Sequence, residues 1–405
     1  MKVTNLPHEF IEATPVIETL EEHGYEAYFV GGSVRDIMMN HEIHDVDIAT
    51  SAYPSEVQAV FQHTVDLGIE HGTILVILND GRYEVTTFRT ESTYQDYRRP
   101  DHVTFVRSLK EDLKRRDFRM NALAMTRNGD IIDLFDGIDD IQNHRICAVG
   151  DAYERFHEDA LRMMRAVRFA SQLDFDIEEK TYQAIYDNHQ LLEKISVERI
   201  QIEWLKMMAG VNPKKGLDAF IQTQCFEACP KMKGKEAELK ELLNKVTQPL
   251  SEAQAWLFLA AVFHNDEAQT KSLLRDWKCS KAMMQLVGGS IEAFYQREHR
   301  CFSDLELYHL GYEKVEFIES SLFFYDNAPS DLHWKERYQQ LPIHHIQDLA
   351  VDGKTLMTAL NQKAGRWLGQ LLHRLEEAVV TGTLVNTTDA LLAYSKEWMK
   401  ENEGI

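Results

Sequence analysis

The sequence lacks the features that mark several large classes of protein. Its 405 residues contain five scattered cysteines and no C-x-x-C pair, so no disulfide framework is expected. No stretch approaches the roughly 18 consecutive apolar residues of a membrane helix, and the N-terminus has no apolar signal segment. The phosphate loop G-x-x-x-x-G-K-[ST] is also missing. These absences favour a reduced cytoplasmic protein without a membrane partner, and they exclude the P-loop type of nucleotide site.

An excess of positive charge is also lacking, because 65 Asp and Glu residues outnumber 44 Lys and Arg residues and the net charge is −21 at pH 7. This argues against a generally basic surface for nucleic acid, although such binding depends on a local patch and not on the total charge. One patch exists at residues 98–119, where eight basic residues outnumber four acidic ones. It is a candidate for binding an anionic ligand, and a solvated helix face is the alternative.

The most informative stretch is residues 29–47, which begins FVGGSVRD and ends HDVD. Gly31 and Gly32 let the backbone approach a ligand closely, because neither carries a Cβ, and free N–H groups in such a turn attract phosphate. Alternate residues of a strand point to the same side, so Asp45 and Asp47 are expected to project together. Two such carboxylates suit Mg²⁺, which shares oxygen ligands with substrate phosphates. The stretch therefore predicts nucleotide chemistry.

Three positions outside this stretch are candidates for the same site. Glu84, on a neighbouring predicted strand, is either a third carboxylate or an exposed strand residue. Arg116 has a planar fork of donors that suits phosphate oxygens. Asp117 beside it is either a site residue or a helix N-cap, because residues 116–117 stand where the pattern predicts the start of a helix over 117–125.

Residues 158–173 predict a helix that carries a base-reading pair. Asp159 and Arg162 are three residues apart and would face the same way; Arg165 stays on that side, and Arg168 has drifted round the helix. An acceptor beside a donor can pair with the amino group and ring nitrogen of cytosine or adenine. Guanine and uracil present a carbonyl beside a ring N–H and would be rejected. The alternative is an intrahelical ion pair, worth only a few tenths of a kcal/mol.

The remaining pattern predicts an α+β fold in which strands are confined to the first part of the chain. Residues 1–150 are expected to form a head domain with a small mixed sheet. Little strand signal follows, so the rest is expected to be an all-α neck, body and tail. These parts are expected at residues 151–210, 211–335 and 336–405 respectively, with the base pocket in the neck.

The order and spacing of these blocks resemble the tRNA nucleotidyltransferases known as CCA-adding enzymes, in their bacterial class and bacillus type, within the polymerase-β-like superfamily. The resemblance is specific across about residues 20–210. The remaining half of the chain matches more loosely and has no HD phosphohydrolase motif. Arg119 stands where the family usually has Thr. The matching blocks are residues 31–36 with 45–47, 115–124, 133–137, 158–170 and 196–200.

The resemblance implies an enzyme that adds C, C and A to the 3′ end of tRNA from CTP and ATP. It would need no template and would release pyrophosphate by two-metal nucleotidyl transfer. Asp45 and Asp47 would be the catalytic residues that bind Mg²⁺, and Gly32 and Arg35 would contact the triphosphate. The resemblance also implies that the head, residues 1–150, is the nucleotidyltransferase catalytic domain and that the tail, residues 336–405, binds tRNA. It further implies a homodimer that binds the acceptor arm of tRNA. The residues implied to line the nucleotide pocket are Arg116, Asp159, Arg162, Arg165 and Arg168.

Three rival functions remain open from the sequence. A poly(A) polymerase of the same family would use ATP alone, and partial enzymes would add only CC or only A. A non-catalytic RNA-binding protein on a transferase scaffold belongs to another class, and the intact Asp45 and Asp47 argue against it. The sequence does not reveal how one pocket changes from C to A, and the polar loop 91–104 is the candidate for that motion.

Overall fold

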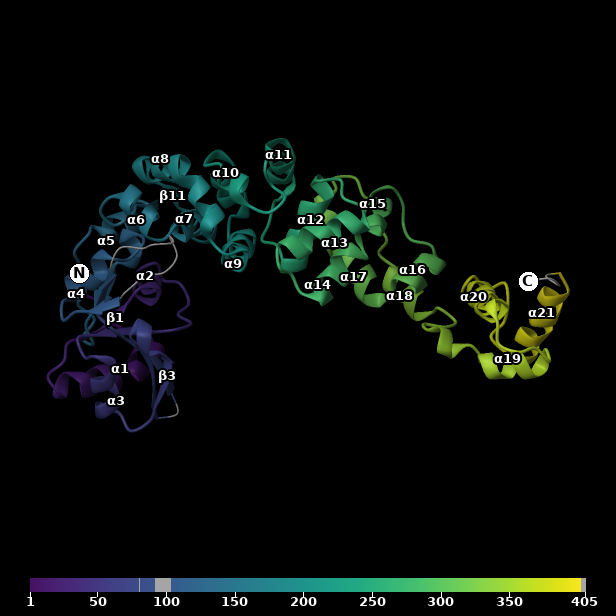
Figure 1. The fold of residues 1–405 in the computed structure, drawn as a ribbon, viewed down its shortest axis with the longest axis horizontal. Helices are drawn as coiled ribbons and strands as arrows, with labels where there is room; N and C mark the ends of the chain where they lie inside the picture. The colour runs from purple at the N-terminus through teal and green to yellow at the C-terminus, as the bar shows by residue number, and fades with distance from the viewer. Residues whose placement is uncertain (80, 92–102, 402–405) are drawn as a thin grey trace. The chain divides into compact units, whose positions relative to one another are not determined.

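The computed structural model describes residues 1–79, 81–91 and 103–401, and the chain divides into two compact units (Figure 1). Unit 1 comprises Met1–Ala255 with Asp276–Lys278, and unit 2 comprises Trp256–Arg275 with Cys279–Ile405. The finer division into head, neck, body and tail stays a prediction. Most of the polar loop 91–104, with Arg98 and Arg99 of the basic patch, lies outside the described residues.

A mixed seven-stranded sheet forms the first part of unit 1. Its strands, in sheet order, are β3 (Thr64–Gly68), β4 (Thr73–Leu78), β5 (Gly81–Thr87), β2 (Asp47–Thr50), β1 (Ala27–Val30), β8 (Leu123–Met125) and β9 (Ile131–Asp133). Within it β2 and β5 run parallel, whereas the other neighbouring strands are antiparallel. Two-stranded pairs are formed by β6 (Arg89–Glu91) with β7 (Val103–Phe105) and by β10 (Arg145–Ile146) with β11 (Asp176–Ile177).

The register of β1 against β2 positions the start of the site. Val30, the last residue of β1, lies opposite Asp47, the first residue of β2. The chain then turns through Gly31, whose φ of 76° is a conformation that glycine adopts without strain. A Cβ on Gly31 would lie 3.1 Å from Nη1 of Arg116. The glycine turn and Asp47 are therefore brought together by strand pairing.

Helices complete unit 1, with α1 and α3 packed together against strands β1, β4 and β5 (Figure 1). Helix α7 packs against α9 and α10 and buries most of its length. The α-helices are α1 (His8–Glu22), α2 (Gly32–Met38), α3 (Pro54–Val60), α4 (Leu109–Lys114), α5 (Gly137–Gln142), α6 (Ala152–Glu158), α7 (Leu161–Leu173), α8 (Glu179–Asn188), α9 (Val197–Met208), α10 (Pro213–Gln222) and α11 (Glu236–Lys245). Short 3₁₀ helices are η1 (Ile69–His71), η2 (Arg119–Asn121), η3 (His189–Lys194) and η4 (Cys225–Ala228).

Within its described residues, unit 2 contains helices joined by loops and no strands. Its core includes Phe258 of α12, which stacks on Phe294 and Phe324 with ring centroids 6.0 and 4.3 Å away. No helix in the described part of the chain is both long and apolar enough to cross a membrane. The helices from the unit boundary onward are α12 (Glu252–Val262), α13 (Glu267–Asp276), α14 (Lys281–Gly288), α15 (Ile291–His299), α16 (Asp304–Leu310), α17 (Tyr312–Ser320), η5 (Leu322–Phe324), α18 (Trp334–Gln339), η6 (Ile346–Asp348), α19 (Gly353–Ala359), α20 (Arg366–Val380) and α21 (Thr388–Glu401).

Two predicted helices near the site are wrong in detail. Residues 117–125 form the short helix η2 and then strand β8, because the buried run Leu123–Met125 pairs with β1 and β9. Tertiary pairing thus overrides a helical pattern. The predicted helix 158–173 is broken at Asp159, which is extended with φ −138° and ψ 103°. Its side chain accepts a hydrogen bond from the N–H of Leu161, and this favours the break.

Asp45 also differs from the sequence expectation. Strand β2 begins at Asp47, so Asp45 precedes the strand and strand alternation does not fix its direction. The two carboxylates therefore do not form the regular strand pair that their spacing indicates.

Candidate nucleotide site

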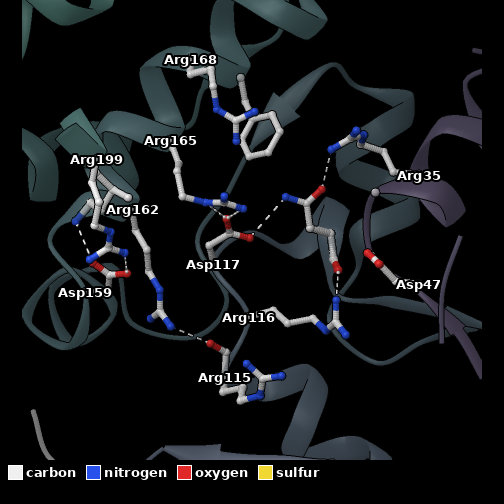
Figure 2. A pocket seen from close by; sticks show the side chains of 15 residues that line it. Arg35, Asp47, Arg115, Arg116, Asp117, Asp159, Arg162, Arg165, Arg168 and Arg199 are labelled. Atoms are coloured by element: carbon white, nitrogen blue, oxygen red, sulfur yellow. Dashed lines mark hydrogen bonds and ion pairs between the residues drawn. The ribbon is translucent and has the colours of Figure 1, made fainter. Parts of the chain in front are cut away.

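A cavity of about 470 Å³ in unit 1 gathers residues from five separate parts of the chain (Figure 2). They come from the β1–α2 turn, the start of β2, the segment after α4, the break between α6 and α7 with α7 itself, and the first turn of α9. The lining residues are Gly31, Gly32, Arg35, Asp47, Arg115, Arg116, Asp117, Asn121, Asp159, Leu161, Arg162, Arg165, Arg168, Phe169 and Arg199.

Every predicted catalytic and nucleotide-binding residue except Asp45 lines this cavity, and the further candidate Glu84 does not. Seven arginines and three aspartates give it a strong local excess of positive charge in a chain whose net charge is −21. Guanidinium groups suit phosphate oxygens, since their donors are fixed in a plane and remain charged. The cavity is therefore chemically suited to a polyanionic ligand such as a nucleoside triphosphate.

Sequence reasoning missed several lining residues. Arg115, Asn121, Phe169 and Arg199 were not singled out, although each stands inside one of the blocks that carried the resemblance. Membership of those blocks was the available signal. What the sequence did not offer was the partner of each side chain, because the partners lie far away in the chain.

Asp47 is the cavity carboxylate whose negative charge is least compensated. Burial raises the pKa of Asp47, and the neighbouring charge of Glu84 raises it further. Arg116 opposes this shift without overcoming it, and the charge of Asp45 adds to it. The charges of three carboxylates therefore act on one another here, in a place where a cation would relieve them.

The oxygen donors around Asp47 fit a hard divalent cation such as Mg²⁺ by their chemistry. Within the described residues, however, no group of three or more His, Cys, Asp or Glu side chains is arranged to hold a metal ion. Asp47 lines the cavity, Asp45 precedes its strand, and Glu84 lies on the adjacent strand β5. Asp45 and Asp47 remain the predicted ligands.

Asn121 connects Arg35, beside the glycine turn, to the helical side of the cavity. Its Oδ1 accepts a hydrogen bond of 2.7 Å from Arg35, and its Nδ2 donates one of 3.2 Å to Asp117. Asp117 in turn forms an ion pair of 2.6 Å with Arg165 of α7. Only a group with an acceptor and a donor end can join a cation to an anion in this way.

Asp117 stays ionised because its arginine partners outweigh its burial. Burial raises the pKa of this carboxyl, but the charges of Arg165 and Arg162 and the hydrogen bond from Arg165 lower it to about 2. Asp117 also accepts a hydrogen bond of 2.8 Å from the N–H of Phe118. Residues 116 and 117 follow α4 and do not start a helix, so the N-cap alternative for Asp117 is wrong.

Two neighbouring arginines of the cavity share one buried anchor. Asp112 of α4 is only 1% exposed in its side chain, and it pairs with Arg115 at 2.8 Å and with Arg116 at 3.2 Å. Burial raises the pKa of Asp112, but the two arginines outweigh this and lower it overall. The anchor holds both guanidinium groups beside the cavity.

The predicted base-reading residues both line the cavity but do not share a helix. Asp159 precedes α7 and forms an ion pair of 2.9 Å with Arg199 of α9. Arg162 lies in the first turn of α7, pairs with Glu158 at 2.7 Å and donates to the carbonyl of Arg115 at 2.8 Å. The Asp159–Arg162 pair is thus set by partners from other elements and not by one helix face.

On the far part of α7, Arg168 is held over an aromatic ring. Its guanidinium lies 3.9 Å from the centroid of Phe169 and forms an ion pair of 2.5 Å with Glu203. Burial lowers the pKa of Arg168 more than the charge of Glu203 raises it.

The sheet, the glycine turn and the cationic cavity define a nucleotidyltransferase, and three family models agree. "Poly A polymerase head domain" matches residues 27–147, which contain the sheet strands. "Probable RNA and SrmB- binding site of polymerase A" matches residues 174–234, and "tRNA nucleotidyltransferase domain 2 putative" matches residues 247–395.

Full-length relatives define the family more closely. The chain is 52% identical over 404 residues to the CCA-adding enzyme of Enterococcus faecalis, and the match covers all of both chains. It is 47% identical to that of Limosilactobacillus reuteri, covering 99% of this chain and 100% of the relative. A solved structure of the Bacillus stearothermophilus CCA-adding enzyme in complex with CTP superposes with a TM-score of 0.90 at 38% identity, covering 98% of this chain and 99% of that one.

The chain therefore belongs to the family of CCA-adding enzymes. The expected α+β fold class, the family and the assignment as a nucleotidyltransferase are confirmed. The alternative of a non-catalytic RNA-binding protein is excluded by the same finding.

Proposed function

We propose that the cavity is where this chain transfers nucleotides to the 3′ end of tRNA. The reaction of the family is the template-independent addition of C, C and A from CTP and ATP, with release of pyrophosphate. One observation carries the location: residues from five parts of the chain, including all predicted catalytic and nucleotide-binding residues but Asp45, converge on one cationic cavity. The relative from Bacillus stearothermophilus has been solved with CTP, which supports a nucleotide as the ligand.

Asp45 and Asp47 are the proposed catalytic residues and the ligands of Mg²⁺, and the family requires a divalent metal. Bound there as a pair of ions, Mg²⁺ would activate the attacking hydroxyl and neutralise charge on the leaving pyrophosphate. The raised pKa of Asp47, caused by burial and by Glu84, supports a cation at this place. Asp47 also lies beside the glycine turn, because β1 and β2 pair in that register.

Gly32, Arg35 and Arg116 are the proposed triphosphate contacts. Gly32 begins α2, so its backbone N–H is among those without a partner inside the helix. Arg35 is 8% exposed and is held by Asp36 at 2.7 Å as well as by Asn121. Arginines fixed in advance lose little freedom when a phosphate binds, and positioning is the main task in phosphoryl transfer.

Asp159 and Arg162 are the proposed readers of the base. A carboxylate that accepts from an amino group, beside a guanidinium that donates to a ring nitrogen, admits cytosine and adenine. Arg165 and Arg168 complete the pocket, with Arg168 lying over the ring of Phe169. A pocket of side chains in place of a paired strand would account for selection without a template.

The helical parts of the chain are the proposed binding surface for the acceptor arm of tRNA, as duplex RNA is usually read by shape and phosphates. The match of residues 174–234 to a probable RNA-binding site supports this. We further propose that the protein is a homodimer and works in the cytoplasm.

The decisive test is incorporation into tRNA that lacks its 3′-terminal CCA, with MgCl₂ and each nucleoside triphosphate alone or combined. CTP alone should add two C, and CTP with ATP should add C, C and A and then stop. A long tail made from ATP alone would identify a poly(A) polymerase instead. A stop after CC, or addition of A only, would identify a partial enzyme, and incorporation of G or U at rates near those of C and A would contradict the proposed base pocket.

A further inference from the structure

The carboxylate of Asp159 is held by a residue from outside its own segment. Asp159 lies in the extended break between α6 and α7, so no helix fixes its direction. Its Oδ1 accepts a hydrogen bond of 3.0 Å from the N–H of Leu161, and its Oδ2 accepts one of 2.9 Å from Arg199. Arg199 belongs to the first turn of α9, 40 residues later, and it lines the same cavity (Figure 2).

These two contacts use only part of the accepting capacity of Asp159. An ionised carboxylate has about four acceptor positions on its two oxygens, so about two remain for a ligand. The Leu161 contact fixes one oxygen, and the planar guanidinium of Arg199 fixes the other. Together they set the plane of the carboxylate, and this plane decides where the remaining acceptor positions point.

The donor half of the base-reading pair is held separately. Arg162 pairs with Glu158 at 2.7 Å and donates to the carbonyl of Arg115 at 2.8 Å. A change at Arg199 therefore acts on the acceptor half and leaves these contacts of the donor half in place.

We propose that Arg199 is a positioning residue for nucleotide selection, acting by fixing the carboxylate plane of Asp159. This inference rests on the proposed reading of the base by Asp159 and Arg162. With its plane fixed, Asp159 offers an acceptor to the amino group of cytosine and opposes the carbonyl that uracil presents at the same place. Without Arg199 the carboxylate turns away from a carbonyl at little cost, so the rejection of uracil weakens.

The test compares R199M with the unchanged protein on tRNA that lacks its 3′-terminal CCA. The measured quantity is the ratio of kcat/KM for CTP to kcat/KM for UTP at the first added position. R199M should lower this ratio about tenfold or more, since a mismatched polar group is then no longer forced against its partner. R199K keeps a charge but has no planar fork, and its ratio should fall between the other two.

Two further measurements separate positioning from a general loss of structure. Arg127 is a matched control, because it is 38% exposed in its side chain against 31% for Arg199, pairs with Glu18 at 2.7 Å and does not line the cavity. R127M should leave the ratio unchanged. In the D159A background, adding R199M should change the ratio no further, because a residue that acts through Asp159 has nothing left to position.

The outcomes distinguish this inference from the proposed function. A normal ratio in R199M together with a collapsed ratio in D159A contradicts the role of Arg199 and leaves base reading by Asp159 intact. A normal ratio in D159A contradicts base reading itself. If R199M does not fold, R199Q decides by the same criterion, since it too lacks the charge and the planar fork.

Discussion

Asp47 and Asp117 line the same cavity, but their surroundings shift the pKa of the two carboxyl groups in opposite directions. Burial and the neighbouring carboxylate of Glu84 raise the pKa of Asp47. Asp117 is buried, yet Arg165 and Arg162 lower its pKa to about 2. The side of the cavity next to β2 has negative charge without a sufficient partner, whereas the side next to α7 supplies its own cations.

The difference separates two kinds of work in one site. An uncompensated carboxylate favours an external cation, and this suits the proposed metal position. A carboxylate already paired with arginine is part of the scaffold and holds other side chains in place. The comparison predicts that removing the carboxylate next to β2 removes activity without loss of stability, whereas removing the one next to α7 affects both.

The largest expected effect is at Asp47. D47N should lower kcat on the order of 10³-fold or more, because it removes charge at the proposed metal position. Without metal the Tm of D47N should equal or exceed that of the unchanged protein, since the unfavourable charge beside Glu84 and Asp45 is gone. Incorporation assays and thermal melts without MgCl₂ check both points. D130N, at a residue half-exposed and paired with Lys2, should change neither. A fully active D47N would show that the metal position is assigned wrongly.

The next effect is at Asn121, which joins the two sides of the cavity. N121D keeps the acceptor for Arg35 but turns the donor that faces Asp117 into a second carboxylate. Repulsion between the new carboxylate and Asp117 should displace the side chain at position 121 and, with it, Arg35, so kcat/KM should fall about 10²-fold. N121A should lose less activity because it introduces no charge. The measurement is kcat/KM for CTP on tRNA lacking CCA.

Asn212 supplies a matched control for N121D. Its Nδ2 also donates to an aspartate, Asp174, at 2.9 Å, and its Oδ1 accepts from the N–H of Lys215 at 3.1 Å, outside the cavity. N212D should therefore cost some stability and leave kcat/KM nearly unchanged. Equal losses of activity in N121D and N212D would mean that the Asn121 bridge has no special role.

The third effect is a pH dependence of stability that belongs to Asp117. Its pKa is about 2 when folded and 3.8 ordinarily, so the ionised carboxylate favours the folded state. This contribution, about 2 kcal/mol, is complete above about pH 4 and is lost as the pH falls towards 2. The free energy of unfolding of D117N, measured in urea, should lie below that of the unchanged protein at pH 7, and the gap should narrow between pH 4 and pH 2. A gap that does not change with pH would contradict the assigned ion pair.

The sequence indicated the glycine turn next to β2 directly, but it did not indicate which residues hold the side chains on the side next to α7, for a physical reason. The glycine turn depends on two adjacent residues and on one strand register, so a local pattern reveals it. Asp159 depends on Arg199, 40 residues later, and Arg35 depends on Asn121, 86 residues later. Such pairs are fixed only by packing. The same packing turned residues 123–125 into a strand and allowed the helix to break at Asp159.

The smallest expected effect tests the glycine turn itself. Gly31 has φ 76°, and an added Cβ would lie 3.1 Å from Nη1 of Arg116. Gly150 has a similar φ of 72°, but nothing lies within 4 Å of its added Cβ. G31A and G150A should each cost about 1 kcal/mol of stability, because a side chain is strained in this conformation. Only G31A should also lower kcat/KM, since only there does the Cβ meet a cavity arginine. If both variants lost the same activity, backbone strain would be the cause, and the close approach of the turn to Arg116 would have no part in the reaction.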